Sequence, residues 1–118
     1  MSEIGFGAWQ IGSSWAGQSE TDSLAALNTA PDNGCNFIDT AQGYGNGKSE
    51  QIIARVLSDR KSNSSRIYVA TKIPPAPGAW PPSPYDRIED RYPDSYLRER
   101  LERSLRDLKT DCIDLIQL

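Results

Sequence analysis

Three ionisable residues stand in or just after two strand-like runs and could together perform acid–base chemistry. Asp39 belongs to the run 36–41, Tyr44 lies in the glycine-rich loop that follows it, and Lys72 belongs to the run 67–73. A tyrosine phenol can donate a proton to a substrate oxygen that gains negative charge, and a neighbouring lysine ammonium stabilises the phenolate that remains. An aspartate paired with the lysine would keep that ammonium charged and aimed at the phenol. The three residue types therefore predict general acid catalysis at a single site.

Taken one at a time, the same residues have structural interpretations. Asp39 can cap the end of a strand, Tyr44 between glycines can be a loop aromatic, and Lys72 can extend its ammonium into solvent. The catalytic interpretation therefore depends on the elements that would bring the three side chains together.

Short apolar runs alternate with helical patterns along the chain. The two central runs carry β-branched or aromatic residues in their middle and are bounded by loop residues, which is typical of strands covered on both faces. The expected strands span residues 4–9, 36–41, 67–73 and 112–118. With a helical pattern between each pair, this order favours parallel strands joined by right-handed crossovers.

Three helical patterns separate the expected strands. The first begins at Ser19, which can form a capping box with Asp22, and Pro31 and Gly34 are expected to end it. The second covers about 49–57 and has a single apolar face.

The third helical pattern is the clearest of the three. Asp94 or Ser95 is expected to cap it, and charged side chains occupy one side. Its leucines recur every three or four residues, at Leu97, Leu101, Leu105 and Leu108. We expect this leucine stripe to dock on another element.

Two architectures use such alternating units, the open doubly wound sheet and the (β/α)₈ barrel. The glycines at 5–7 and 43–47 do not have the G-x-G-x-x-G spacing of a dinucleotide-binding open sheet. Polar ionisable residues at strand ends suit a barrel, whose active sites are built there. The predicted fold class is α/β: the first half of a (β/α)₈ barrel, with about four parallel strands and three intervening helices forming one partial barrel over 1–118.

Half a barrel would leave two strand edges and an inward sheet face uncovered. We expect that face to carry residues such as Phe37, Val69 and Leu115. Such a chain would be unstable alone, would associate with itself through the open edges, or would be completed by a missing half.

Composition and charge exclude several classes of partner. The formal net charge is −3 with no basic cluster, which disfavours nucleic acid and anionic membranes. No apolar run approaches the length of a spanning helix, and the start has no signal core, so a soluble cytoplasmic protein is predicted. Cys35 and Cys112 each open an apolar run, which predicts buried, reduced thiols, with a disulfide between them as the alternative. No metal site is predicted.

Five segments, in order, closely resemble the aldo-keto reductases. They are Ile4-Gly5-Phe6-Gly7-Ala8-Trp9, Asn36 to Glu50 with its D-T-A and Y-G-x-G-x-S-E strings, Val69-Ala70-Thr71-Lys72, Leu101-Glu102-Arg103-Ser104-Leu105, and Ile113 to Leu118. The resemblance covers nearly the whole chain. It implies a (β/α)₈ barrel that moves a hydride from NADPH to an aldehyde or ketone.

The resemblance also assigns roles to residues. It implies that Asp39, Tyr44 and Lys72 fill three of the family's four catalytic positions, with Tyr44 as the proton donor. The family's histidine follows a Gln-Leu pair that corresponds to Gln117-Leu118, the last two residues here, and the chain contains no histidine. Because the chain also begins at the first strand, we expect that both ends are cut and that the isolated chain is inactive.

The implied cofactor contacts are partial. By resemblance Gly7, Ala8, Trp9 and Asp39 approach the nicotinamide end of NADP(H), whereas the determinants for the adenosine phosphate lie in the family's second half. Trp15 could line the cofactor or substrate, or pack in the core or rim.

The segment 74–93 holds seven of the eight prolines and is expected to be a long loop that shapes the pocket, or else a polyproline ligand for a partner. The alternative to an enzyme is a non-catalytic half-barrel that binds or assembles, as in the potassium-channel beta subunits that resemble this family.

Overall fold

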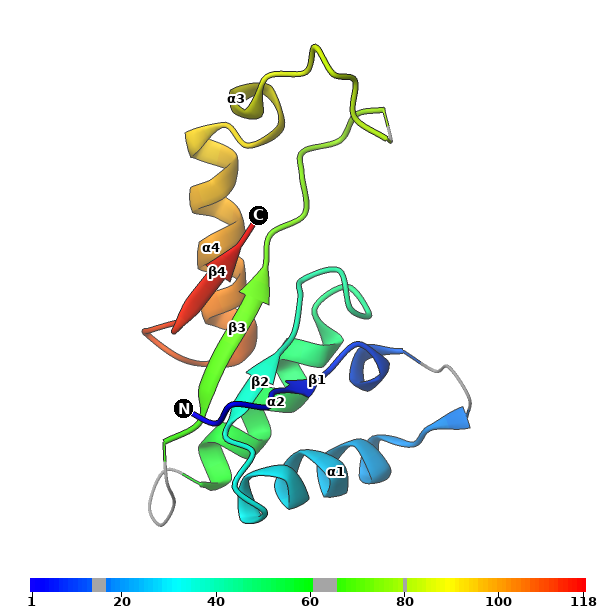
Figure 1. Cartoon of the computed structure of the whole chain (residues 1–118), viewed down its shortest axis with the longest axis vertical. Coiled ribbons are helices and arrows are strands. Elements are labelled where there is room, and N and C mark those ends of the chain that lie inside the picture. Colours follow the sequence, from blue (N-terminus) through cyan, green and yellow to red (C-terminus); the bar gives the residue numbers. More distant parts are fainter. Residues whose placement is uncertain (14–16, 61–65, 80) are drawn as a thin grey trace.

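The computed structural model describes residues 1–13, 17–60, 66–79 and 81–118. Within these residues parallel strands alternate with helices, as Figure 1 shows. The strands are β1 (Phe6–Gly7), β2 (Phe37–Asp39), β3 (Tyr68–Lys72) and β4 (Leu115–Gln117). The helices are the 3₁₀ turn η1 (Gln10–Gly12), α1 (Glu20–Asp32), α2 (Lys48–Asp59), α3 (Ile88–Arg91) and α4 (Asp94–Leu108). The short α3 was not expected from the sequence.

The strands lie in one parallel sheet in the order β1-β2-β3-β4, which confirms the predicted α/β fold. Gly7 is opposite Asp39, and Lys72 is opposite Gln117. Each strand lies inside its expected range but is shorter. β1 in particular ends early because the chain turns at Trp9 into η1.

The core fills one face of the sheet, where α2 and α4 lie behind the strands in Figure 1. Its buried side chains are Ala8, Ile11, Leu27, Ile38, Ile52, Ile53, Val56, Val69 and Leu108. Val69 was expected on the inward sheet face together with Phe37 and Leu115, and for Val69 this expectation is wrong. Side chains alternate across a strand, so Val69 shares the helix face with Thr71 while Lys72 lies on the other.

Two helix ends differ from the sequence expectation. α1 includes Pro31 and ends one residue later, at Asp32, so Pro31 itself does not end the helix. The expected end at Gly34 is confirmed, as a Schellman motif: Gly34 has a φ of 84°, its N–H donates to Pro31 O, and the N–H of Cys35 donates to Ala30 O. The capping box of Ser19 and Asp22 is confirmed.

The leucine stripe of α4 is only partly docked. Leu108 is buried, but Leu101 is 37% exposed, and Ser104 occupies a fully buried position that the stripe did not predict. Neither Asp94 nor Ser95 caps the helix, because the N-cap position is Pro93. The helix therefore faces the rest of the chain with a polar edge that includes Ser104.

Both cysteines are free thiols, but neither is fully buried. Cys35 is half-buried with its thiol 3.3 Å from Ile4 O, and Cys112 is exposed in the turn before β4. Trp15 lies outside the described residues. No helix among the described residues is long and apolar enough to cross a membrane.

Candidate active site

Asp39 and Lys72 meet at the carboxyl edge of the sheet, because they end two adjacent parallel strands. Lys72 Nζ lies 2.8 Å from Asp39 Oδ1 and 2.7 Å from Oδ2, and it also donates to Thr40 O at 3.0 Å. The two side chains are 33% and 35% exposed. The ammonium is thus held by three oxygens, and the expected pair of Asp39 with Lys72 is present.

Tyr44 joins this pair from the loop after β2. Lys72 Nζ lies 5.3 Å from the centroid of the Tyr44 ring, on its face, where a cation is attracted by the aromatic quadrupole. The N–H of Tyr44 donates to Ala41 O, and Tyr44 O accepts the N–H of Ser49 at the start of α2. The structure therefore brings all three predicted residues together.

A close backbone contact holds the Tyr44 loop in place. A methyl group added at Gly12 would lie 2.3 Å from Tyr44 O, and one added at Gly45 would lie 1.9 Å from Gly12 O. Gly45 also has a φ of 63°, a left-handed conformation that glycine adopts without strain. Only glycines at both positions allow η1 to lie against the loop in this way.

The other side of the loop is held by α4. Arg103 Nη2 donates to Asn46 O at 2.8 Å and to Asn46 Oδ1 at 2.9 Å. Asn46 has a φ of 55°, so these bonds restrain a residue in an uncommon backbone conformation. The same guanidinium lies 3.5 Å from Asp107.

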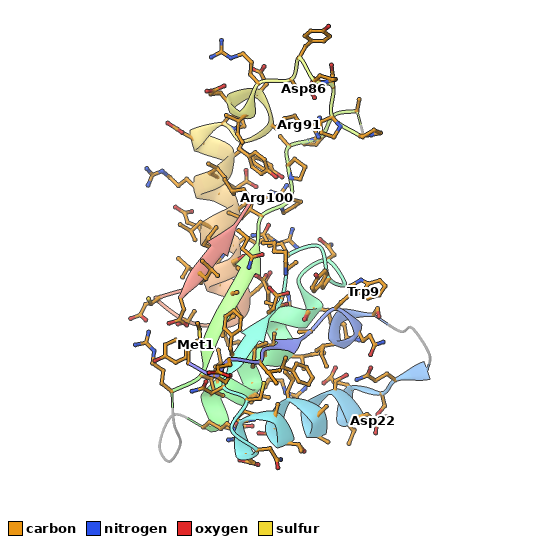
Figure 2. The ribbon with its side chains drawn as sticks, viewed as in Figure 1. Met1, Trp9, Asp22, Asp86, Arg91 and Arg100 are labelled. Atoms are coloured by element: carbon orange, nitrogen blue, oxygen red, sulfur yellow. The ribbon has the colours of Figure 1, made fainter. Side chains whose placement is uncertain are left out.

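The residues expected to approach a nicotinamide line the end of β1. Ala8 is buried and its N–H donates to Asp39 O at 2.8 Å, so its main chain is tied directly to the site. Gly7 is exposed, and a methyl group added there would meet no atom within 4 Å. Trp9, labelled in Figure 2 at the start of η1, is more than half exposed. The edge therefore offers open space next to Lys72 and Asp39.

The described residues of the proline-rich segment, 74–79 and 81–93, extend beyond β3, as Figure 1 shows. Tyr96 Oη on α4 donates to Pro74 O, and Arg91, labelled in Figure 2, donates to Ala79 O at 3.1 Å and lies 3.5 Å from Asp86. The extension thus has its own internal polar contacts. Its role in shaping a pocket stays a prediction.

A second, buried polar layer lies directly behind these residues and was missed by sequence reasoning. Ser49 Oγ accepts from Thr40 Oγ1 at 2.9 Å and donates to Ala8 O at 3.0 Å. Glu50 Oε1 accepts from Thr71 Oγ1 at 2.7 Å and from Ser104 Oγ at 2.8 Å. The sequence did contain a feature that predicts this layer. A threonine stands next to Asp39 and another next to Lys72, and neighbouring residues of a strand point to opposite faces of the sheet.

Glu50 is the ionisable group of this layer. It is fully buried, which raises its pKa above the ordinary value; the hydroxyls of Thr71 and Ser104 lower that pKa again, Asp107 raises it and Arg103 lowers it. Its second oxygen, Oε2, has no hydrogen-bond partner among the described residues.

Known proteins share both the sequence pattern and the fold. Residues 3–118 match the model of the Aldo/keto reductase family. The chain is 35% identical to a 6-dehydroglucose reductase of Novosphingobium aromaticivorans, and the match covers 100% of this chain and 37% of the relative. It is also 35% identical to the aldo-keto reductase YhdN of Bacillus subtilis, where the match covers 99% of this chain and 34% of the relative. It is 30% identical to a probable voltage-gated potassium channel subunit beta of Arabidopsis thaliana, covering 98% and 33%.

Solved structures agree. An aldo-keto reductase from Bacillus halodurans in its holo form superposes with a TM-score of 0.74 at 31% identity, over 99% of this chain and 35% of that one. An aldo-keto reductase from Klebsiella pneumoniae in complex with NADPH gives 0.70 at 27% identity, over 96% and 33%. The chain spans about a third of the length of these relatives. Asp39, Tyr44 and Lys72 lie together at the carboxyl ends of the strands, and the family model matches almost every residue. The chain therefore belongs to the aldo/keto reductase family of oxidoreductases.

Proposed function

We propose that this chain carries the proton-donating part of an NADPH-dependent carbonyl reductase, in which Tyr44 is the proton donor. The observation that carries the proposal is the placement of one ammonium, Lys72 Nζ, between the two oxygens of Asp39 and the face of the Tyr44 ring. From this place the ammonium can stabilise negative charge left on the Tyr44 phenol while Asp39 holds it.

The chemistry of each residue follows from this placement. When bound, NADPH would supply the hydride that reduces the carbonyl carbon. Negative charge then builds on the carbonyl oxygen, and Tyr44 Oη gives it a proton. The phenolate left on Tyr44 is stabilised by Lys72, and Asp39 keeps that ammonium charged and oriented. The product is an alcohol, and the phenol must recover its proton from water before the next turnover.

The residues present fit the nicotinamide end of such a cofactor. The open space at Gly7, the largely exposed indole of Trp9 and the partly exposed Lys72 form one continuous edge of the sheet. Lys72 is already paired with Asp39, so it is not available to hold a phosphate. Support for NADPH in particular comes from the Klebsiella pneumoniae relative, which was solved with that cofactor.

The experiment compares the natural gene product at its full length with its Tyr44→Phe variant. NADPH consumption is followed with a panel of aldehydes and ketones, and cofactor affinity is measured by fluorescence. We expect Tyr44→Phe to lower kcat by about 10² to 10⁴-fold and to leave cofactor affinity unchanged, because only the proton donor is lost. Equal turnover in both proteins would refute the assignment. The 118-residue chain by itself is expected to show no reduction above the Tyr44→Phe background.

A second candidate is a non-catalytic assembly module. It is favoured by the 30% identity to a probable potassium channel subunit beta and by the uncovered sheet face, on which Leu115 is exposed. In this case the chain would bind a protein partner or a second copy of itself through the open edges. A complex of defined stoichiometry in light scattering, unchanged when Asp39, Tyr44 and Lys72 are all replaced, would support the module over the enzyme.

A further inference from the structure

Glu50 is a fully buried carboxyl group that the proposed reaction does not use. It is 0% exposed, in the first turn of α2, and it contacts Thr71 on the helix side of the sheet. A buried carboxyl group with no compensating cation in direct contact is costly to keep, so its partners indicate what it does.

The partners of Glu50 come from two other elements. One oxygen, Oε1, accepts the hydroxyl hydrogens of Thr71 on β3 at 2.7 Å and of Ser104 on α4 at 2.8 Å. Ser104 Oγ in turn accepts from Gln42 Nε2 at 2.8 Å, in the loop after β2. A single atom therefore ties α2, β3 and α4 together at the height of the strand ends.

Thr71 is the residue directly before Lys72. Successive side chains of a strand point to opposite faces, so Thr71 reaches back to Glu50 while Lys72 reaches forward to Asp39 and Tyr44. Any shift of Thr71 must move the Cα of Lys72, since consecutive Cα atoms are held about 3.8 Å apart.

We propose that Glu50 is a positioning residue for Lys72, which it sets through the hydrogen bond to Thr71 and the shared contact with Ser104. The proposal rests on the proposed function, in which Lys72 stabilises the Tyr44 phenolate. Burial raises the pKa of Glu50, the hydroxyls of Thr71 and Ser104 lower it, and Asp107 and Arg103 of α4 act on it in opposite directions. Glutamine should replace Glu50 well, since its amide oxygen can accept the hydroxyl hydrogens of both Thr71 and Ser104.

The experiment uses the natural gene product at its full length with isotope-labelled lysine side chains, observed by NMR. The Lys72 signal is assigned by its loss in Lys72→Arg. Thr71→Val removes the bond to Glu50 with little change in size, Glu50→Leu removes the acceptor, and Glu50→Gln keeps it. Ser23→Ala is the matched control, because Ser23 is a buried hydroxyl of α1 that bonds only near its own helix start in the described contacts.

We expect Thr71→Val and Glu50→Leu to move the Lys72 signal and to lower kcat about ten- to a hundredfold with little change in KM, the size of effect that a small misplacement produces. Glu50→Gln should keep both the signal and kcat, and Ser23→Ala should keep both whatever it does to stability. An unmoved Lys72 signal in folded Thr71→Val would overturn the proposal, and this variant decides if Glu50→Leu does not fold. The NMR signal reports on Lys72 even if the protein reduces no carbonyl, so failure of the proposed function is seen separately.

Discussion

Replacing Gly12 by alanine should displace Tyr44 without touching any ionisable group. The added methyl group would lie 2.3 Å from Tyr44 O, 2.5 Å from Tyr44 C and 2.9 Å from Gly45 N, whereas ordinary contact begins at 3.4 Å. The neighbours are main-chain atoms, which cannot rotate away, so η1 and the loop must separate by about 1 Å. A misplacement of that size costs about 10² in rate, and overpacking of this kind costs about 1–3 kcal/mol in stability.

The assay is kcat and KM for NADPH-dependent carbonyl reduction, with thermal unfolding measured in parallel on the natural gene product. Gly43→Ala is the matched control, because Gly43 lies next to Tyr44, yet a methyl group there would meet no atom within 4 Å. We expect about a hundredfold loss of kcat in Gly12→Ala and less than about twofold in Gly43→Ala. If folded Gly12→Ala keeps the wild-type kcat, the close contact does not position Tyr44 and the reasoning is wrong.

Two further predictions concern the supports of the site. Arg103→Ala removes both bonds to Asn46, so it should lower the free energy of unfolding by about 1.5–3 kcal/mol and speed amide exchange in the loop. The control is Arg106→Ala, because Arg106 is exposed and its pair with Glu102 spans 4.0 Å. This variant should change the free energy of unfolding by less than about 0.5 kcal/mol. Equal effects of the two variants in urea unfolding would contradict this. Burial raises the pKa of Glu50 above its ordinary value of 4.5, so the folded state binds the extra proton and the free energy of unfolding should fall as pH rises from about 4.5 through the raised pKa. Glu50→Gln should lose this component, and identical pH profiles of stability for the two proteins would refute the assignment.

Much of the architecture was predictable because local patterns encode local structure. The order of apolar runs and helical patterns predicted the parallel sheet, and the side-chain types at two strand ends predicted that Asp39 and Lys72 would meet. The capping box at Ser19 needs only residues three apart, so it too was readable.

The errors arose where a local rule met a tertiary contact. Pro31 was expected to end its helix together with Gly34, but α1 includes Pro31 and only the end at Gly34 is confirmed. Val69 was placed on the inward face because apolar character alone does not say which side of a strand is covered. The leucine pattern of α4 also missed Ser104, which is buried and donates to Glu50 of α2, far away in the sequence.

By itself the sequence determined the family, the fold class and the types of residue at the candidate site. Only the tertiary structure decided how these residues are held: Gly12 against Tyr44, Arg103 against Asn46, and Glu50 between Thr71 and Ser104. The physical reason is the distance along the sequence over which each kind of interaction acts. Periodicity and capping act between residues a few positions apart, whereas Gly12 and Tyr44, or Glu50 and Ser104, become neighbours only when the sheet and helices pack, and no local pattern records that contact.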